Sequence, residues 1–379
     1  MHFPCLSALA ACVALSLTPH ADAEDLYRPT ATSTAQLAVS HGIAIARVQG
    51  SGAEMGDQIA SLAAVPLRFL LQSVVRQVDD SALQSIPAAY QAELVAIASG
   101  IGMKSSLLAT ANLIVDRRCS VLVYRDPANG AQAQPLLLAR NMDYAPPEIL
   151  GPTTLITVYR GHDCHAFASV GWPGFCGVVS GMNDAGVCVC ILLNEQGVQH
   201  RAGEPICFRL REMLEQAKTV EGAVRLFAAS PVASTHYVVI ADPLTACVVW
   251  QDSTGMHRQG LVLDRLTCTN ALRSADGVQS DVRGTYLTKL LGGAAHPDAA
   301  WMRSALTGCY VSGLNAQAMV FIPSHLSLQL ALSEHGLPAA LGDWQAIDLA
   351  GIMAGNAFPV PLTADLGPVP DPLTHYTSP

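Results

Sequence analysis

The sequence predicts a layered α+β fold in which helices cover mostly antiparallel β-structure. Half of the 379 residues are hydrophobic and 13% are charged, whereas about 25% is usual for soluble domains, so the chain is suited to burying a large core. Helix-like and strand-like patterns occur in blocks: helices, strands, two helices, then strands. This order disfavours a doubly wound parallel fold, in which strands and helices alternate.

The first block is helical and the second is a hairpin. Apolar residues recur at helical spacing between Gly56 and Asn112, as in Tyr90, Leu94 and Ile97. Strand-like runs follow at 120–124 and 136–139, joined by the turn-forming residues 126–130. We therefore expect helices up to residue 112 and then a hairpin that begins at Cys119.

The remaining elements complete the layers. Strands are predicted at 155–159, 166–170 and 187–193, followed by amphipathic helices over 206–217 and 220–228. Strand-like runs return at 237–241, 247–250, 320–322 and 326–332, with a helix at 285–291. The Pro-rich tail after Pro359 is expected to be extended, and no internal repeat is present.

Charge and hydropathy exclude two classes of function. The 21 Lys and Arg against 30 Asp and Glu give a net charge of −9, which offers no basic face for nucleic acid. Beyond the N-terminus, no run of about 18 apolar residues is free of charges and turn formers, so no membrane span is expected.

The N-terminus has the pattern of a secretory signal over residues 1–23. The apolar run 6–17 is too short to span a bilayer, and Ala21-Asp22-Ala23 has the small-x-small spacing of a cleavage site. A second interpretation is a lipoprotein signal, in which Cys12 would be the lipidated residue. Both predict a periplasmic or secreted protein.

Nine cysteines remain after such a signal is removed, and an odd number implies at least one free thiol. Several lie in apolar strand-like runs, where cysteine serves as a small hydrophobe. Disulfides and free thiols are about equally compatible with the sequence, and no pairing is assigned. The cysteines are Cys119, Cys164, Cys176, Cys188, Cys190, Cys207, Cys247, Cys268 and Cys309.

The densest group of reactive residues lies on the two arms of the hairpin. Cys119 begins one arm, and Arg140 and Asp143 lie on the other. A thiol is nucleophilic only as the thiolate, so Cys119 would need a base or a nearby cation, and Arg140 is a candidate for the cation. A purely structural role for the three residues is also compatible with the spacing.

Several separated motifs give the chain a resemblance to a known family. It resembles the penicillin acyltransferase-like (acyl-coenzyme A:6-aminopenicillanic acid acyltransferase) branch of the N-terminal-nucleophile hydrolases, related to choloylglycine hydrolase and acid ceramidase. The motifs appear in the family's order between residues 50 and 332. They are GSGAEMG at 50–56, Cys119-Ser120, Arg140-Asn141-Met142-Asp143, GMNDAG at 181–186, Thr269-Asn270 and Arg283.

The resemblance implies an αββα sandwich that is made as an inactive precursor and cuts itself between Arg118 and Cys119. Residues 24–118 would form a small, mostly helical subunit, and residues 119–379 a large catalytic one; the two would stay associated. Cys119 would then be the nucleophile, and its free α-amine, with a reference pKa of about 7.7 to 8, the base.

The resemblance also assigns roles to the other motif residues. Asp143 would orient the α-amine, Arg140 would favour the thiolate, and Arg283 would support the site or contact a carboxylate. Asn183 and Asn270 would donate to the oxyanion, a contribution of about 2.7 to 4 kcal/mol each. No cofactor is implied.

Two classes of function follow. The first is an exported amidase that acts on a small N-acyl substrate through an acyl-Cys119 intermediate, or an acyltransferase that passes the acyl group to an amine. The second is a non-catalytic binding protein on the same fold, in which the chain stays uncut. A homo-oligomer is compatible with both classes. Residues 171–175 could line an acyl pocket or form a packed corner. His162, Cys164 and His165 have no second pair at a finger-like spacing, so no metal is assigned.

Overall fold

The computed structural model describes Tyr27 and residues 35–40, 42–75, 77–113, 118–127, 135–194, 203–271, 273, 279, 281–355 and 364–365. The predicted signal over residues 1–23 and almost all of the predicted tail lie outside these ranges. Among the described residues, no helix is both long and apolar enough to cross a membrane.

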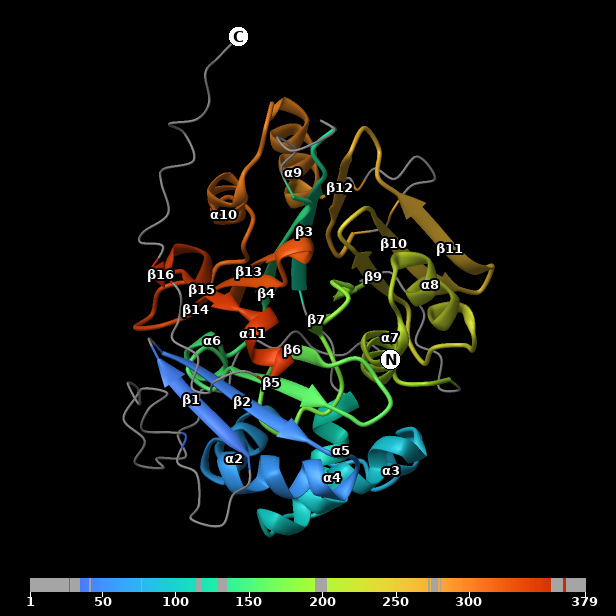
Figure 1. The fold of residues 1–379 in the computed structure, drawn as a ribbon, viewed down its shortest axis with the longest axis vertical. Helices are drawn as coiled ribbons and strands as arrows, with labels where there is room; N and C mark the ends of the chain where they lie inside the picture. The colour runs from blue at the N-terminus through green and yellow to red at the C-terminus, as the bar shows by residue number, and fades with distance from the viewer. Residues whose placement is uncertain are drawn as a thin grey trace.

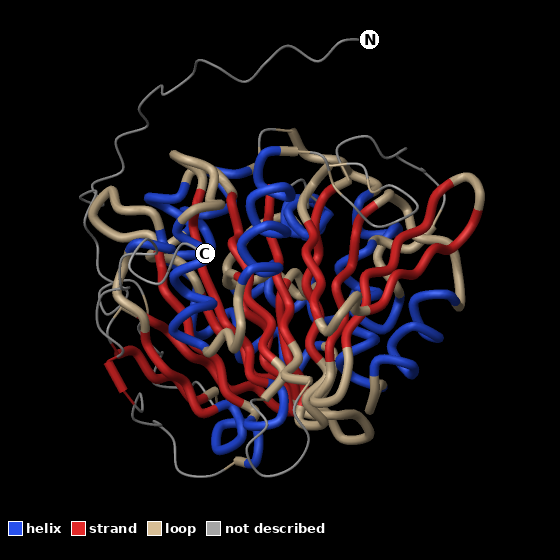
Figure 2. Tube along the Cα trace, turned by 90° about the horizontal axis from the view of Figure 1, so that it is seen from above, coloured by secondary structure: helices blue, strands red, loops and turns tan. Residues whose placement is uncertain are grey.

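Two β-sheets form the body of the molecule (Figure 2). The first has nine strands in the order β1-β2-β5-β6-β7-β8-β9-β10-β11 and is antiparallel except for the parallel pair β2 and β5. Its strands are β1 Gln36–Ser40, β2 Ile43–Gln49, β5 Leu155–Arg160, β6 Phe167–Gly171, β7 Ser180–Asn183, β8 Cys188–Leu193, β9 His236–Ala241, β10 Ala246–Asp252 and β11 Gly255–Gly260.

The second sheet has seven strands and is antiparallel throughout, in the order β12-β3-β4-β13-β14-β15-β16. Its strands are β12 Arg265–Cys268, β3 Arg118–Tyr124, β4 Leu137–Asp143, β13 Asn315–Ile322, β14 Ser327–Leu332, β15 Gln345–Asp348 and β16 Ala364–Asp365.

Strand β3 shows how the layers are stacked. Its side chains alternate between two cores, because successive residues of a strand point to opposite faces. Val121 and Val123 join the main core, which includes residues of both sheets. Leu122 and Tyr124 join a second core beneath helices α9 (Val282–Gly293) and α10 (Ala299–Thr307). Cys119 belongs to the main core, so its side chain lies on the face toward the other sheet.

Helices cover the outer faces of both sheets. In Figure 1, α9 and α10 lie beside β3, β4 and β13, and α2, α4 and α5 lie at the other end of the molecule beside β1, β2 and β5. Helices α7 and α8 pack on β7 to β10 of the first sheet. The longer helices are α2 Ala53–Val74, α4 Ala88–Gly100, α5 Ser105–Leu113, α7 Ile206–Gln216, α8 Val220–Ala228, α9 Val282–Gly293 and α10 Ala299–Thr307; the short ones are α3 Ala82–Ser85, α6 Pro147–Leu150 and α11 Leu349–Ala354.

This arrangement confirms the predicted four-layer αββα sandwich of mostly antiparallel sheets. The predicted helices, the hairpin at Cys119 and the predicted strands are all present, with ends that differ by a few residues. The sequence analysis did not predict β1, β2, β7, β11, β12, β15, β16 or helices α6, α10 and α11. Most of these are short, and β11 is largely exposed, so they lack the buried apolar run that marks the other strands. Strand β2 is the exception: it has seven residues and is mostly buried, and the sequence analysis missed it although most of its residues are apolar.

The glycines of the first family motif have a packing role. Gly56 lies where α2 crosses α4, and a Cβ there would come within 2.3 Å of the Glu93 carbonyl oxygen. Gly50 and Gly52 precede the helix with φ of 103° and 49°, a region that favours glycine. The motif therefore permits a tight turn and a close helix crossing.

The cysteines that the sequence left open are free thiols. All nine lie within the described residues, and eight are buried while Cys164 is exposed. Cys188 and Cys190, which lie in one of the apolar strand-like runs, are buried on β8.

Candidate active site

The β3–β4 hairpin brings three of the predicted site residues together. Its register pairs Arg118 with Asp143, Cys119 with Met142, and Val121 with Arg140. Arg118 is exposed and Cys119 is fully buried. The proposed cleavage point thus lies where the strand passes from the surface into the core.

Arg140 contacts the thiol directly. Its Nη2 donates to Cys119 Sγ at 3.1 Å and to the Ile191 carbonyl at 2.8 Å, and its Nη1 donates to the Val179 carbonyl. Arg140 is completely buried. Burial raises the pKa of the Cys119 thiol above its usual value, and the Arg140 guanidinium opposes that rise. In the uncut chain the thiol is therefore favoured over the thiolate.

Both backbone polar groups of Cys119 are held by side chains. Its N–H donates to Asn270 Oδ1 at 2.7 Å, and its carbonyl accepts from Arg283 Nη1 at 2.9 Å. Arg283 Nη2 also donates to Asn270 Oδ1 at 2.9 Å, and Asn270 Nδ2 donates to the Leu193 carbonyl at 2.7 Å. Asn270 therefore contacts the nitrogen atom that cleavage would convert into an α-amine.

Asp143 is a buried carboxylate beside this group. Asn315 Nδ2 donates to its Oδ1 at 2.9 Å, and Arg283 Nη1 lies 3.5 Å from its Oδ2. Burial raises the pKa of Asp143 to about 6, although the Asn315 hydrogen bond and the two arginines lower it. Asn315 lies at an irregularity in the pairing of β13 with β4, and such bulges re-aim side chains near functional sites.

Asn183 has a different place. Its Nδ2 donates to the carbonyls of Leu214 and Ala217 at 2.9 and 2.7 Å, and its Oδ1 accepts from the backbone of Ala185 and Val187. These bonds use the full donor and acceptor capacity of the amide. The structure therefore brings Asn183 to the β7–β8 turn and the end of α7 rather than to Cys119, and this geometry disfavours the predicted oxyanion role.

Asn194 is a buried amide that sequence reasoning missed. It follows β8 directly after Leu193, whose carbonyl accepts from Asn270, and is 6% exposed. Side chains of a strand share a face at every second residue, so Asn194 continues the face of Cys190, which hydrogen-bonds Arg140. The available signal was its position at the end of the predicted strand 187–193.

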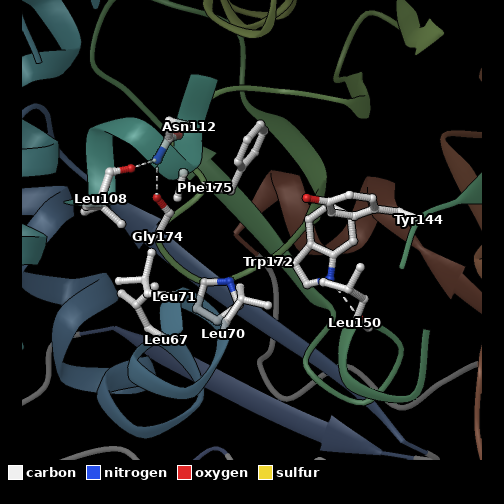
Figure 3. A pocket seen from close by; sticks show the side chains of 12 residues that line it. Leu67, Leu70, Leu71, Leu108, Asn112, Tyr144, Leu150, Trp172, Gly174 and Phe175 are labelled. Carbon is white, nitrogen blue, oxygen red and sulfur yellow. Dashed lines mark hydrogen bonds between the residues drawn. The ribbon is translucent and has the colours of Figure 1, made fainter. Parts of the chain in front are cut away.

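An apolar pocket lies next to this group, with about 380 Å³ of empty space including its opening to solvent. Figure 3 shows Trp172, Tyr144 and Leu150 close together and leucines of α2 facing the loop that follows β6. Tyr144 directly follows Asp143, and the loop that supplies Trp172 and Phe175 continues to Val179, which accepts from Arg140. The lining residues are Leu67, Leu70, Leu71, Leu108, Ala111, Asn112, Tyr144, Leu150, Trp172, Pro173, Gly174 and Phe175.

The predicted loop residues His162, Cys164 and His165 lie outside this group. His165 Nδ1 contacts Asp184 Oδ1, and Cys164 is exposed. Within the described ranges, no three His, Cys, Asp or Glu side chains gather as potential metal ligands.

The comparisons with known proteins agree with the motifs. Residues 129–283 match the family described as acyl-coenzyme A:6-aminopenicillanic acid acyl-transferase. The matched segment contains Arg140, Asp143, Asn183, Asn270 and Arg283, and Cys119 lies ten residues before it. The resemblance predicted from the motifs is thereby confirmed for this part of the chain. Among curated proteins, none is significantly similar in sequence.

Several solved structures resemble this one at low sequence identity. An N-acylethanolamine-hydrolyzing acid amidase ortholog from Caenorhabditis elegans is 19% identical, with a TM-score of 0.45 over 59% of this chain and 95% of that chain. A conjugated bile acid hydrolase variant from Clostridium perfringens is 13% identical, with a TM-score of 0.45 over 63% and 95%. Penicillin V acylase from Agrobacterium tumefaciens is 14% identical, with a TM-score of 0.36 over 61% and 91%.

Proposed function

We propose that the protein is an exported cysteine amidase that cuts its own chain between Arg118 and Cys119 and then hydrolyses the linear amide bond of an N-acyl substrate. The observation that carries this proposal is the set of contacts that hold the thiol and the backbone nitrogen of Cys119. Its thiol lies 3.1 Å from a buried guanidinium, and its backbone nitrogen lies 2.7 Å from Asn270 Oδ1. The match of residues 129–283 to an acyltransferase family supports the same reading.

Cleavage would supply the base that the uncut site lacks. A free α-amine has a reference pKa of about 7.7 to 8, so roughly a tenth to a third of it is neutral between about pH 7 and 7.4 and can accept the thiol proton, whereas a lysine amine is almost entirely charged there. The thiolate then attacks the amide carbonyl carbon, and the tetrahedral intermediate forms. The leaving amine takes a proton from the α-ammonium as the C–N bond breaks, which leaves a thioester on Cys119. Water attacks the thioester, releases the acid and restores the thiol.

Two amides are placed to stabilise the oxyanion. Asn270 is in direct contact with Cys119, and its Nδ2 donates to a backbone carbonyl that a substrate oxygen could replace. We assign the second donor to Asn194, because it lies next to Leu193 and continues the face of β8 that reaches Arg140. Asn183 has no amide capacity left for this role.

The residues that line the pocket indicate which kind of acyl group the enzyme accepts. Its walls are mostly leucine and aromatic side chains, and its polar residue Asn112 already bonds the backbone of Leu108, Gly174 and Cys176. An uncharged aliphatic or aryl acyl chain fits such walls because burying it costs no unpaired polar group.

Acyl transfer is the second candidate, and the observation that favours it is the acyltransferase family that matches residues 129–283. The two reactions share every step up to the thioester and differ in whether water or an amine accepts the acyl group. We favour water because we expect the predicted N-terminal signal to export the enzyme.

Intact-mass analysis of the purified chain tests the proposal. With protease inhibitors present, we expect two fragments that meet at Arg118 and Cys119 in the wild type and one uncut chain in Cys119→Ala. Cys164→Ala is the matched control, because it removes an exposed thiol away from the site and should leave cleavage unchanged. An external trypsin-like protease would still cut Cys119→Ala after the Arg117-Arg118 pair. A wild type that stays uncut would favour a binding protein.

A further inference from the structure

The loop between β6 and β7, residues 172–179, is held in place by side chains from other elements. Asn112 Nδ2 donates to the Gly174 carbonyl at 2.9 Å, and its Oδ1 accepts from the backbone of Cys176 at 2.8 Å. The Cys176 carbonyl accepts from Arg211 Nη1, also at 2.8 Å. Because the loop lies outside the helices and strands, these side chains satisfy backbone groups that a sheet or helix would otherwise pair.

Arg211 is a buried cation in a closely fitted site on α7. Its residue is 3% exposed, and its guanidinium carbon lies 4.6 Å from the ring centre of Tyr90 and 4.5 Å from that of Tyr159. Its Nε lies 2.9 Å from Glu215 Oε1 on the same helix. A guanidinium can make such planar, multiple contacts at once, whereas an ammonium acts as a single point.

Glu93 connects this arginine to the N-terminal segment. Glu93 lies on α4, is 1% exposed, and its Oε2 is 2.9 Å from Arg211 Nη1. Tyr90, one helical turn earlier, donates its hydroxyl to Glu215 Oε2 at 2.9 Å. A buried charge whose partner is removed is strongly destabilising, so the position of α4 and the position of Arg211 depend on each other.

The loop leads from this pair to the nucleophile. Its Cys176 carbonyl accepts from Arg211, and three residues later the Val179 carbonyl accepts from Arg140, which donates to Cys119 Sγ. The same loop supplies Trp172 and Phe175 to the pocket. The buried Glu93–Arg211 ion pair therefore contacts loop 172–179. This loop lines the pocket and accepts a hydrogen bond from Arg140.

We propose that Glu93 and Arg211 are positioning residues for the reaction: the pair anchors loop 172–179 to the N-terminal segment and thereby keeps Arg140 against the Cys119 thiol. This inference rests on the proposed function in that Cys119 is taken as the nucleophile. In this proposal Glu93, which lies before the cleavage point, helps to position Arg140, which lies after it.

Two substitutions test the pair, and a third serves as the control. Glu93→Gln keeps the shape and removes the charge, and Arg211→Lys keeps the charge and removes the planar contacts. Arg209→Lys is the matched control, because Arg209 is on the same helix, is equally buried at 3%, and is ion-paired to Glu204 and Glu212 away from the loop.

The first readout is hydrogen exchange of the backbone amides in 172–179. We expect exchange about tenfold faster or more in Glu93→Gln and Arg211→Lys, because local opening becomes easier when a loop loses its anchors. Exchange in β13 of the same molecules gives the reference for global stability. Arg209→Lys should leave loop exchange as in the wild type.

The second readout is the pH midpoint of the Cys119 thiolate, followed by the ultraviolet absorbance of the thiolate as the difference between each chain and its Cys119→Ala counterpart, because the thiol is buried and absorbance needs no reagent to reach it. The groups that face the Cys119 thiol are Arg140, Asp143 and Arg283, together with the thiols of Cys190 and Cys268. When Arg140 is no longer held, the midpoint should rise by about half to one pH unit in both test variants. A residue with a merely structural role would leave it unchanged.

Faster loop exchange together with a raised midpoint in both test variants, with neither change in Arg209→Lys, is the expected result. Unchanged loop exchange, an unchanged midpoint, or equal effects in Arg209→Lys would overturn the proposal. If Arg211→Lys does not fold, the isosteric Glu93→Gln decides. Both readouts are available whether or not the chain cuts itself, so an uncut wild type would count against the proposed function and leave this test intact.

Discussion

Cys119 is held at three atoms before any bond is cut. Asn270 accepts from its N–H, Arg283 donates to its carbonyl, and Arg140 donates to its sulfur. Arg140 belongs to the same hairpin as Cys119, whereas Asn270 and Arg283 lie 151 and 164 positions further along the chain, so both backbone contacts of Cys119 depend on the tertiary structure. Cleavage would convert the Cys119 nitrogen into a free α-amine, and the side chains that contact Cys119 would already be in place.

Asp143 should make stability depend on pH. Its pKa is raised from 3.8 to about 6, so the native state binds the proton more tightly than the unfolded chain does. Its contribution to the free energy of unfolding is therefore fully present below about pH 4 and is lost as the pH rises through about 6, a change of roughly 3 kcal/mol.

Asp143→Asn in an uncut Cys119→Ala background should remove this dependence. We expect the free energy of unfolding of the Cys119→Ala chain to fall, relative to the double variant, as the pH rises from about 4 to about 7. Urea unfolding at a series of pH values measures both. Parallel curves would contradict the expectation.

The two asparagines should separate a catalytic from a structural role. Asn194→Ala should lower kcat on an N-acyl amide by about 10²- to 10³-fold, because it removes an oxyanion donor, while the thermal midpoint changes little. Asn183→Ala should lower the thermal midpoint instead, since it removes four hydrogen bonds to backbone groups, three of them buried. The reverse pattern of activity and stability would return the oxyanion role to Asn183.

At the scale of elements, the hairpin and its partners explain how much of the site could be predicted. The pairing of β3 with β4 follows from two apolar runs and a turn, so the proximity of Cys119, Arg140 and Asp143 was predictable from local pattern. Asn315 was not, because its contact with Asp143 depends on the irregular pairing of β13 with β4. Asn183 ends β7 and Asn194 follows the end of β8, and what each amide contacts depends on how these strand ends pack, which the sequence does not state.

The crossing of α2 and α4 gives a prediction at the same scale. A Cβ at Gly56 would lie 2.3 Å from the Glu93 carbonyl oxygen and 2.8 Å from the Ala96 Cβ, so Gly56→Ala should separate the helices. We expect a loss of roughly 2 to 4 kcal/mol in the free energy of unfolding.

Gly292→Ala is the matched control for Gly56→Ala. Gly292 lies in α9, where a Cβ would meet nothing within 4 Å, so alanine should stabilise the helix by about 0.5 to 1 kcal/mol. Urea unfolding of both variants in the Cys119→Ala background makes the comparison. Similar effects of the two substitutions would show that the close crossing does not matter.

At the scale of the whole molecule, the proposed cleavage point divides one continuous core. Strand β2 from the segment before Cys119 pairs in parallel with β5 from the segment after it, from Ala44 opposite Leu155 to Gln49 opposite Arg160. Side chains of α2, α4 and α5 share the main core with both sheets. The described residues on the two sides of the proposed cleavage point therefore share one sheet and one core.

A cut wild-type chain should therefore stay assembled. We expect it to elute as one species of the full mass in native size exclusion with light scattering, like uncut Cys119→Ala, and to separate into two fragments only in denaturant. The physical reason is that separation would expose the buried ladder of β2 and β5 and the apolar faces of α2 and α4. A free N-terminal fragment under native conditions would contradict this expectation.

The sequence by itself determined the layered fold, the order of most elements, the hairpin at Cys119 and the resemblance that the match over residues 129–283 confirmed. Periodicity, turn residues and short motifs are local, and local signals are enough for these. Only the tertiary structure decided which asparagine lies near Cys119, what lines the pocket and which buried ion pair holds the loop beside it. Each of these depends on contacts between residues far apart in the chain, and such contacts exist only once the sheets have packed.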